Sequence, residues 1–344
     1  MRIVLQKYSD QTIYELNPFV TSFTHDMSLD AISSTLTFSI VHNPYDDDLR
    51  RMIPEIEVGD SISLFSPIDD PIPNYLVFYG KVNHVGKSNK QGTITYKCYN
   101  ALYNLGASTT NKIYNTTAEN IGLLICQDFN IKSFYFEPTL INIGKQIFEN
   151  KSYYQILKES YEKAGKALNH KFYIHMDGVT LGVLPLGYPL CIDKLSDGSD
   201  DPEVGSAQYS NIIRANKDVD SSDIVNIVKA YDDNGNLIGE LRDEESIAHY
   251  GIKETTYHQE ENVNIQDGMK ELLKPDPTES ITVQTRGFWQ WWPGRSVMVH
   301  DRETELEGQY VIKRAEHCHE GDHYITNLEL EFMENSEINK SLEA

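Results

Sequence analysis

The chain has 344 residues, which is enough for two or three domains that each bury a core of their own. Its 52 acidic residues outnumber its 30 lysines and arginines and give a formal net charge of −22 at pH 7. No run rich in lysine and arginine is present, so the composition disfavours proteins that grip nucleic acid by its phosphates. An acidic wall would instead let a polyanion slide past without adhering, although the same charge also simply keeps a chain soluble.

The cysteines are too far apart in the chain to indicate a zinc knuckle or a disulfide framework. They are Cys98, Cys126, Cys191 and Cys318. The first ten residues lack the apolar core of a signal peptide, and no apolar run reaches the roughly 18 residues of a membrane helix. We therefore expect a protein that is made and assembled in a cytoplasm and has no membrane partner.

Residues 1–105 alternate β-branched or aromatic side chains with polar ones, which predicts a first antiparallel β-barrel domain. The expected strands lie at residues 13–16, 34–40, 61–65, 75–85 and 93–99. Between them, residues 43–48 combine proline with three aspartates. They lack the spaced ligands and distal glutamate of an EF-hand, so we expect an exposed loop there and no calcium site.

Residues 106–192 predict a helical and hairpin middle domain. Thr116 and Glu119 have the spacing of a capping box, and apolar residues follow them at helical intervals. Ser152 and Gln155 have the same spacing and predict the start of a second helix. Residues 171–184 then form two strand-like runs around Asp177-Gly178, a pair typical of a type I′ hairpin turn.

Residues 193–335 predict a second β-barrel domain, and residues 336–344 a polar tail. Residues 193–205 read as an exposed linker, and residues 224–241 as a hairpin around Asn234-Gly235. A short helical end is expected at residues 248–251, and an inserted helix at residues 263–273 is stopped by the prolines that follow it. The fold class is thus mainly β with α insertions.

A turn and three strands of the first domain recur in the same order near the C-terminus. Gly59 and Ser61 open residues 59–65, which are followed by strands at 75–85 and 93–99, while Gly294 and Ser296 open a similar series that ends at residue 332. We interpret this order as a decayed internal repeat. The alternative is that two unrelated antiparallel regions look alike.

No sequence motif of a catalytic site is present. The chain lacks a nucleophile elbow, an H-E-x-x-H pair, a P-loop and a dinucleotide glycine fingerprint. Its carboxylates show no spacing typical of a glycosidase, although a pair formed only in space would leave no such pattern. We expect no catalytic residues, no cofactor and no enzyme activity.

The best candidates for metal ligands are His317, Cys318, His319 and His323. Strand alternation places His317 and His319 on one face, and a turn at residues 320–322 would bring His323 across from them. Because the hairpin supplies no evident fourth ligand, we favour structural histidines and expect no metal.

All three tryptophans lie in the run Phe-Trp-Gln-Trp-Trp-Pro at residues 288–293. Five apolar residues at the junction of a loop and a strand are too many for one strand face. Such rings fill a core or anchor a protein interface, and the sequence leaves both alternatives open. The candidate interface residues are Trp289, Trp291 and Trp292.

The ordered series of these segments resembles the XkdQ/YqbQ-type baseplate hub proteins of contractile-tailed phages, prophages and phage-tail-like bacteriocins, which are similar to the myovirus hub and the VgrG base. Each segment alone is unspecific, and the aromatic run before Gly294 is heavier than this resemblance predicts. The segments are residues 58–62, 79–82, 95–105, 116–121, 152–157, 177–178, 226–232 and 293–297.

This resemblance implies two tail-tube-like barrels in each subunit and a homotrimer that forms a pseudo-sixfold ring. The ring would join a sixfold tail tube to a threefold central spike, with tail tube, spike, baseplate wedge and tape measure proteins as partners. Sequence-specific nucleic-acid binding is not implied. We expect carboxylates to line the inner wall of the ring.

Two functions of other classes remain as alternatives. The first is a peptidoglycan-degrading hydrolase at the tail tip, whose catalytic carboxylates are hidden among the acidic residues. The second is a carbohydrate- or receptor-binding β-protein that binds saccharide at the tryptophan cluster.

Overall fold

The computed structural model describes residues 1–67, 72–88, 92–191, 193–199, 210–232, 234–258, 264–320 and 323–333. The chain divides into two compact units. Unit 1 comprises Met1–Ala215 and Thr282–Ala344, and unit 2 comprises Asn216–Ile281. Strands dominate the structure and helices occupy the segments between them, so the predicted fold class of mainly β with α insertions is confirmed.

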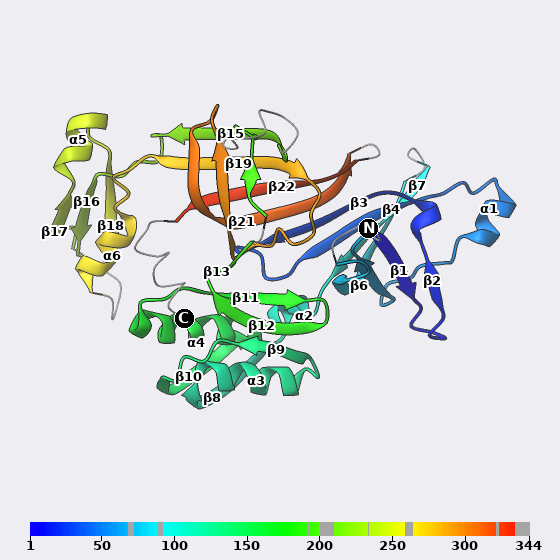
Figure 1. The fold of residues 1–344 in the computed structure, drawn as a ribbon. Coiled ribbons are helices and arrows are strands. Elements are labelled where there is room, and N and C mark those ends of the chain that lie inside the picture. The colour runs from blue at the N-terminus through cyan, green and yellow to red at the C-terminus, as the bar shows by residue number, and fades with distance from the viewer. Residues whose placement is uncertain are drawn as a thin grey trace. The chain divides into compact units, whose positions relative to one another are not determined.

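Five antiparallel strands form what we call the first module, in the spatial order β5-β6-β7-β4-β3 (Figure 1). Alternate side chains of β4 (Leu36, Phe38 and Ile40) point into its core, as the sequence pattern predicts. The strands are β3 (Val20–Ser28), β4 (Thr35–Val41), β5 (Ser61–Phe65), β6 (Leu76–Lys87) and β7 (Thr93–Tyr99). The N-terminal strands β1 (Arg2–Gln6) and β2 (Ile13–Glu15) continue the sheet beyond β5, and the short helix η1 (Asn17–Phe19) leads into β3.

Five later strands form the second module in the corresponding order, β20-β21-β22-β19-β15. Counted along the chain, the third, fourth and fifth strands of each module form a meander, β5-β6-β7 in the first module and β20-β21-β22 in the second. The second strand (β4 or β19) pairs with the fifth, and the first strand (β3 or β15) pairs with the second. The predicted repeat is therefore present in the strand order. The strands are β15 (Ile212–Asp220), β19 (Thr278–Arg286), β20 (Arg295–Asp301), β21 (Leu306–Glu320) and β22 (His323–Phe332), and β13 (Gly187–Leu190) and β14 (Leu195–Ser196) pair with β20.

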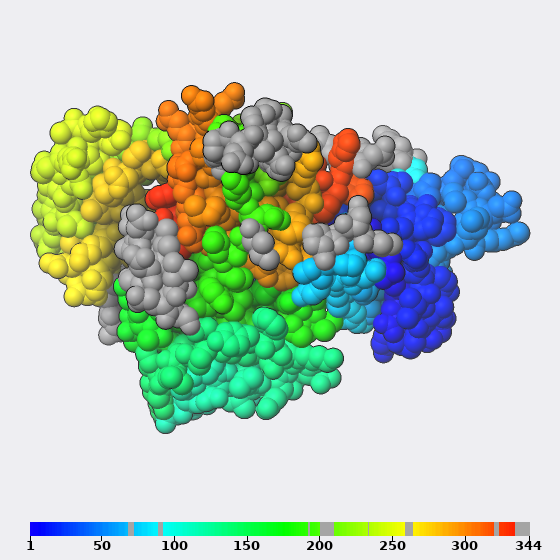
Figure 2. All heavy atoms as spheres, viewed as in Figure 1, coloured from blue at the N-terminus to red at the C-terminus, as the bar shows by residue number. Residues whose placement is uncertain are grey.

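The segment between the modules forms a lobe of its own in unit 1 (Figures 1 and 2). Its second helix starts with the predicted capping box, in which Ser152 and Gln155 bond each other's backbone amides. The first helix differs from the prediction, because its N-cap is Thr117 and Glu119 instead accepts bonds from residues 139 and 140. The elements are α2 (Leu102–Ala107), β8 (Thr109–Thr117), α3 (Ala118–Asp128), β9 (Lys132–Phe136), β10 (Asn142–Ser152), α4 (Tyr153–Leu168), β11 (Phe172–Asp177) and β12 (Thr180–Pro185).

Between the ends of β15 and β19, the described residues of unit 2 form a small three-stranded sheet with two helices. Its core consists of Val228, Ala230, Tyr257 and Met269. The insertion is thus larger than the single helix at residues 263–273 that we predicted. Its elements are β16 (Ile227–Tyr231), β17 (Leu237–Arg242), α5 (Glu244–Tyr250), β18 (Glu254–His258) and α6 (Ile265–Leu272).

Two predicted loops contain regular structure. Helix α1 (Asp47–Met52) begins within the acidic run, because the Asp46 carboxylate accepts the Leu49 amide at 2.9 Å and so caps the helix. It projects from the first module (Figures 1 and 2). In the predicted linker, Leu195 is buried and pairs with β20, while residues 200–205, like the polar tail at 336–344, lie outside the described residues.

Candidate functional site

The turn that precedes the meander is built identically in the two modules. Gly59 has a φ of +98° and Gly294 a φ of +92°, a region in which glycine is favoured. The Gly59 amide donates to the Val82 carbonyl at 2.8 Å, and the Gly294 amide donates to the Ile312 carbonyl at 2.8 Å. Both bonds run from the turn to the fourth strand of the module, so β6 and β21 correspond residue by residue.

A β-bulge follows at the same place in each fourth strand. The pairing of β6 with β7 skips Asn83, and the pairing of β21 with β22 skips Lys313. Asn83 and Lys313 directly follow Val82 and Ile312, whose carbonyls accept hydrogen bonds from the amides of the two turn glycines. Because a bulge bends and twists its strand, the two modules share their curvature here as well as their strand order.

Hydrogen bonds between polar side chains also join β4 to β7 in the first module and β19 to β22 in the second, at corresponding positions. Ser39 and Thr95 share a hydroxyl hydrogen bond at 2.9 Å, and Gln284 donates to the Asn327 side chain at 3.1 Å. The agreement therefore extends across the whole meander, which is not expected of two unrelated β-regions.

The modules are joined edge to edge in what we call the seam. Residues 314–318 of β21 pair antiparallel with residues 24–28 of β3. The Arg314 guanidinium lies 2.8 and 3.2 Å from the two Asp26 carboxylate oxygens and 3.1 Å from Glu329. This two-pronged ion pair fixes the register, because the planar guanidinium matches the geometry of a carboxylate.

Two histidines face each other inside the seam. His25 is opposite His317 in the strand register, and the ring centroids are 6.0 Å apart. His317 Nε2 lies 3.2 Å from the Trp291 carbonyl, while the hydroxyls of Tyr324 and Thr326 each lie 3.0 Å from its Nδ1. These partners fit a neutral ring that donates from Nε2 and accepts at Nδ1.

Burial keeps both imidazoles uncharged. Desolvation, together with the smaller effect of the nearby His317, lowers the pKa of His25 to about 3. Desolvation also lowers the pKa of His317 to about 4, against the bond to Trp291, which raises it. Both ring nitrogens of His25 are without a hydrogen-bond partner among the described residues. The seam therefore contains a site that resists protonation.

The three tryptophans are buried, with at most 3% of each residue exposed. Trp289 and Trp292 belong to the same apolar core as the first module, although they precede a strand of the second. Trp289 stacks on Tyr75 at 4.4 Å between centroids, and Trp292 contacts the His175 ring at 4.3 Å. They form an interface within the chain that links both modules to the lobe. A contact of Trp289, Trp291 or Trp292 with another subunit stays a prediction.

A buried polar cluster surrounds these rings. The Tyr75 hydroxyl donates to the Asp177 carboxylate at 2.5 Å, which connects the first module to the hairpin of the lobe. Burial raises the pKa of Asp177, whereas the bond from Tyr75 opposes the shift. The Arg295 guanidinium lies 4.9 Å from the centre of the Trp292 ring. Burial, and to a smaller extent the charge of Arg295, lowers the pKa of His175 to about 3.

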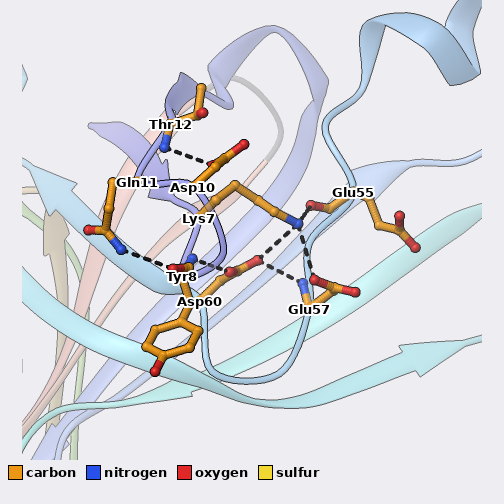
Figure 3. A network of polar contacts seen from close by, with 8 residues as sticks. All are labelled: Lys7, Tyr8, Asp10, Gln11, Thr12, Glu55, Glu57 and Asp60. Carbon is orange, nitrogen blue, oxygen red and sulfur yellow. Dashed lines mark hydrogen bonds and ion pairs between the residues drawn. The ribbon is translucent and has the colours of Figure 1, made fainter.

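A second polar network holds the turn of the first module (Figure 3). The Asp60 carboxylate accepts the backbone amides of Tyr8 at 2.8 Å and Glu57 at 2.9 Å. Lys7 Nζ lies 3.6 Å from Asp60 and donates to the Glu55 carbonyl at 2.8 Å. The N-terminal strands are thus tied to the turn that opens β5.

The histidines proposed as metal ligands do not converge. His317 bonds other partners, and the His319 ring packs against Phe23 at 4.7 Å between centroids. The strand register places Tyr324 opposite His319, so His323 lies at the end of the hairpin and not across from the other two. Among the residues that the structure describes, no group of three His, Cys, Asp or Glu side chains could hold a metal ion.

The fold is similar to that of solved phage tail proteins. The chain aligns with the 43 kDa tail protein of prophage MuSo2 from Shewanella oneidensis with a TM-score of 0.68 and 14% identity, covering 96% of this chain and 98% of that one. It aligns with a tail protein from Neisseria meningitidis at a TM-score of 0.65 and 16% identity, covering 99% and 98%. For prophage tail protein gp18 from Listeria monocytogenes the TM-score is 0.54 at 13% identity, covering 100% of both.

Sequence comparison then identifies the family. The profile of the YQBQ-like proteins matches residues 23–331, and the chain belongs to this family. The resemblance inferred from the sequence is therefore confirmed. No curated protein matches the chain. Within the described part of the chain, every helix is too short or too polar to cross a membrane.

Proposed function

We propose that this protein is the structural hub of a contractile tail baseplate. Three copies form a ring of six similar modules, which joins a sixfold tail tube to a threefold central spike. The observation that carries the proposal is the shared strand order of the two modules, down to the turn glycines and the bulges. Two quasi-equivalent modules in each of three chains supply six positions.

The hub has no catalytic role in this proposal. Its partners are the tail tube, central spike, baseplate wedge and tape measure proteins, and it is assembled in the bacterial cytoplasm. Carboxylates line its inner wall, so that DNA or tape measure protein passes without adhering; the net charge of −22 supports this arrangement. A ring with a basic inner wall would contradict it.

Mass measurement tests the ring directly. Native mass spectrometry, alone and with the tail tube protein, should give a species of three times the 39.3 kDa chain mass. Electron micrographs of the assembled particle, classified by symmetry at the baseplate, should show sixfold density meeting threefold density at this protein. A chain that stays monomeric in both samples would overturn the proposal.

The hydrolase alternative predicts a different result. A purified sample should leave peptidoglycan intact in a zymogram, because the proposal assigns no catalytic pair. Clear lysis of peptidoglycan by this chain alone would favour the hydrolase over the structural hub.

A further inference from the structure

A cavity of about 650 Å³ opens beside helix α4, where the lobe meets the loop that follows β3. Phe172, Leu186 and Val311 form part of its wall, and all of its lining residues belong to unit 1. The charged residues that line it are Asp30, Lys158, Glu162, Lys166 and Lys171. A cavity of this size and lining can accept a ligand that carries both apolar and charged groups.

The lobe differs in charge from the rest of the chain. Residues 102–185 contain eight lysines and seven acidic residues, so this segment is close to neutral in a chain with a net charge of −22. The lobe therefore repels an acidic partner less than the rest of the chain does. An acidic segment of a second copy can dock here at little electrostatic cost.

The charges along the cavity have an order. Lys158 and Glu162 form an ion pair at 3.9 Å on the exposed side of α4. Burial and, to a smaller extent, the charge of Asp30 raise the pKa of Tyr154, which places Asp30 near the start of this helix. Lys166 lies in its last turn. Positive charge therefore prevails at the C-terminal end of α4, and carboxylates lie nearer its start.

An unpartnered segment with matching chemistry projects from the first module. Residues 43–53, which we call the arm, surround helix α1 (Figures 1 and 2). Tyr45 is 95% exposed and Met52 is 67% exposed, and both residue types are enriched at protein interfaces. Asp48 and Arg51 pair at 3.8 Å with side chains 94% and 80% exposed. Such an exposed pair contributes little to stability, so both charges are available to a partner.

We infer that the arm of one copy docks in the cavity of a second copy, with Tyr45 as its apolar anchor and Asp48 beside Lys166. This inference rests on the proposed ring and names a contact that links its copies. Helices α1 and α4 lie well apart in unit 1 (Figure 1), so the arm reaches the cavity of a neighbour and not its own. Because the arm and the cavity are different surfaces, the contact is head to tail and can close into a ring of three.

The order of charges sets the direction of the arm. Asp48 precedes Arg51 by three residues, and Glu162 precedes Lys166 by four. Both spacings are close to one helical turn, so each pair of charges lies on one face of its helix. When α1 runs antiparallel to α4, Asp48 faces Lys166 and Arg51 faces Glu162. The parallel direction sets like charges against each other and is disfavoured.

The same direction places the apolar side chains of the arm. Tyr45 precedes α1 and so lies beyond Lys166, toward the cavity wall at Phe172. Met52 ends α1 and lies at the other end of the cavity, toward Tyr154. Docking thus removes from water the two large apolar side chains that the arm exposes, which is the main favourable term in association.

Removing the anchor tests the contact. Tyr45→Ala should weaken trimer formation about tenfold or more, measured by native mass spectrometry of the full-length chain over a dilution series, because aromatic anchors dominate interfaces. Its midpoint of urea unfolding should match that of the wild type, since the side chain is almost fully exposed. Tyr8→Ala is the matched control, because Tyr8 is 75% exposed on the N-terminal strands, and it should leave the trimer unchanged. Equal weakening by both variants would contradict the role of the arm.

Charge exchange tests the direction. Asp48→Lys sets a like charge against Lys166 and should weaken trimer formation about tenfold, and adding Lys166→Asp should restore it. Lys145 supplies the control, since it is exposed on β10 of the same lobe and does not belong to the cavity lining. Adding Lys145→Asp to Asp48→Lys should leave the trimer weakened. Restoration by either lysine variant would indicate a general effect of net charge and would overturn the contact.

Failure of this contact and failure of the ring give different results. A trimer that forms equally well with Tyr45→Ala and with Asp48→Lys would overturn the arm as the occupant of the cavity and leave the ring in place. Loss of tail tube binding by Lys166→Asp, with trimer formation unchanged, would assign the cavity to the tail tube protein and would also overturn the arm. A chain that stays monomeric with the tail tube protein present would overturn both proposals.

Discussion

Asp60 and Arg295 follow the two matched turn glycines and carry opposite charges. Asp60 is 2% exposed and is satisfied by two backbone amides and a lysine, whereas Arg295 lies against the Trp292 ring. The same backbone position thus anchors the N-terminal strands in one module and the tryptophan cluster in the other. The two modules therefore share the backbone conformation of this turn, whereas the side chains at the matched position make different contacts.

Replacing Asp60 should therefore destabilise the first module. Asp60→Asn removes the negative charge that two amide donors and Lys7 share, and a lost charge-assisted bond of this kind costs about 1.5–3 kcal/mol. Urea unfolding followed by fluorescence measures the loss. Asp10→Asn in the neighbouring exposed turn is the control and should have the smaller effect. Equal losses would contradict the role assigned to the buried carboxylate.

The buried histidines predict a loss of stability in acid. Unfolded histidine titrates near pH 6.5, while the pKa is about 3 for His25 and about 4 for His317 in the fold. The fold therefore binds fewer protons, and its full stability is present above about pH 6.5. As the pH falls from there toward the folded pKa values, each ring costs about 1.4 kcal/mol per pH unit.

The variant His25→Phe tests this prediction, because it keeps an aromatic ring in the seam but cannot be protonated. Its free energy of unfolding should fall less than that of the wild type between pH 7.5 and pH 5, measured by urea titration at each pH. His323→Gln, at the exposed end of β22, should follow the wild-type curve. Parallel curves for wild type and His25→Phe would show that this ring does not govern the acid response.

At the scale of elements, the two turns share a backbone but differ in what surrounds them. A methyl group added at Gly59 would meet nothing within 4 Å, whereas one added at Gly294 would lie 2.3 Å from a carbon of the Tyr173 ring. The first turn is open to solvent on that side, and the second is closed by the lobe. The lobe therefore packs on the second module at the point where its meander begins.

The two glycines form a matched pair for mutagenesis. Gly59→Ala should cost about 1–2 kcal/mol through backbone strain alone, since φ stays positive. Gly294→Ala has the same strain and adds a collision with a buried ring, which costs about 1–3 kcal/mol more. Midpoints of urea unfolding compare the two variants. A Gly59 variant as unstable as the Gly294 variant would argue against the contact with Tyr173.

At the scale of the whole molecule, the two units differ in the size of their cores. Four buried residues make up the core of unit 2, while unit 1 contains the cores of the first module and the lobe, each with at least sixteen. Because apolar burial is the main favourable term in folding, unit 2 should be the less stable of the two. Unfolding of the chain is then not a two-state process.

The tryptophans make this difference measurable, since all three belong to unit 1. Hydrogen exchange should lose protection within residues 227–272, the elements β16 to α6, at lower urea than the tryptophan fluorescence changes. Met269→Ala should shift the first transition and leave the second unchanged. Coincident transitions would mean that the two units unfold together.

Local patterns explain which elements could be predicted. The alternation of Leu36, Phe38 and Ile40 with hydroxyl residues predicted β4, and the capping box at Ser152 predicted α4, because each signal lies within a few residues of chain. The ribbon of β8 and β10 was missed. Its central pair, Ile113 and Ile147, is 61% and 58% exposed, so neither strand shows the alternation of a half-buried sheet.

The sequence alone determined strands β4 to β7 of the first module, the capped helix, the order of the repeat and the family, since periodicity, turn residues and motif order are all local properties. Only the tertiary structure decided that Trp289 and Trp292 complete the core of a module more than 180 residues earlier in the chain, and that His317 meets His25 across the seam. Such contacts depend on how distant strands close on one another, and a strand carries the same pattern whether its edge is paired or free.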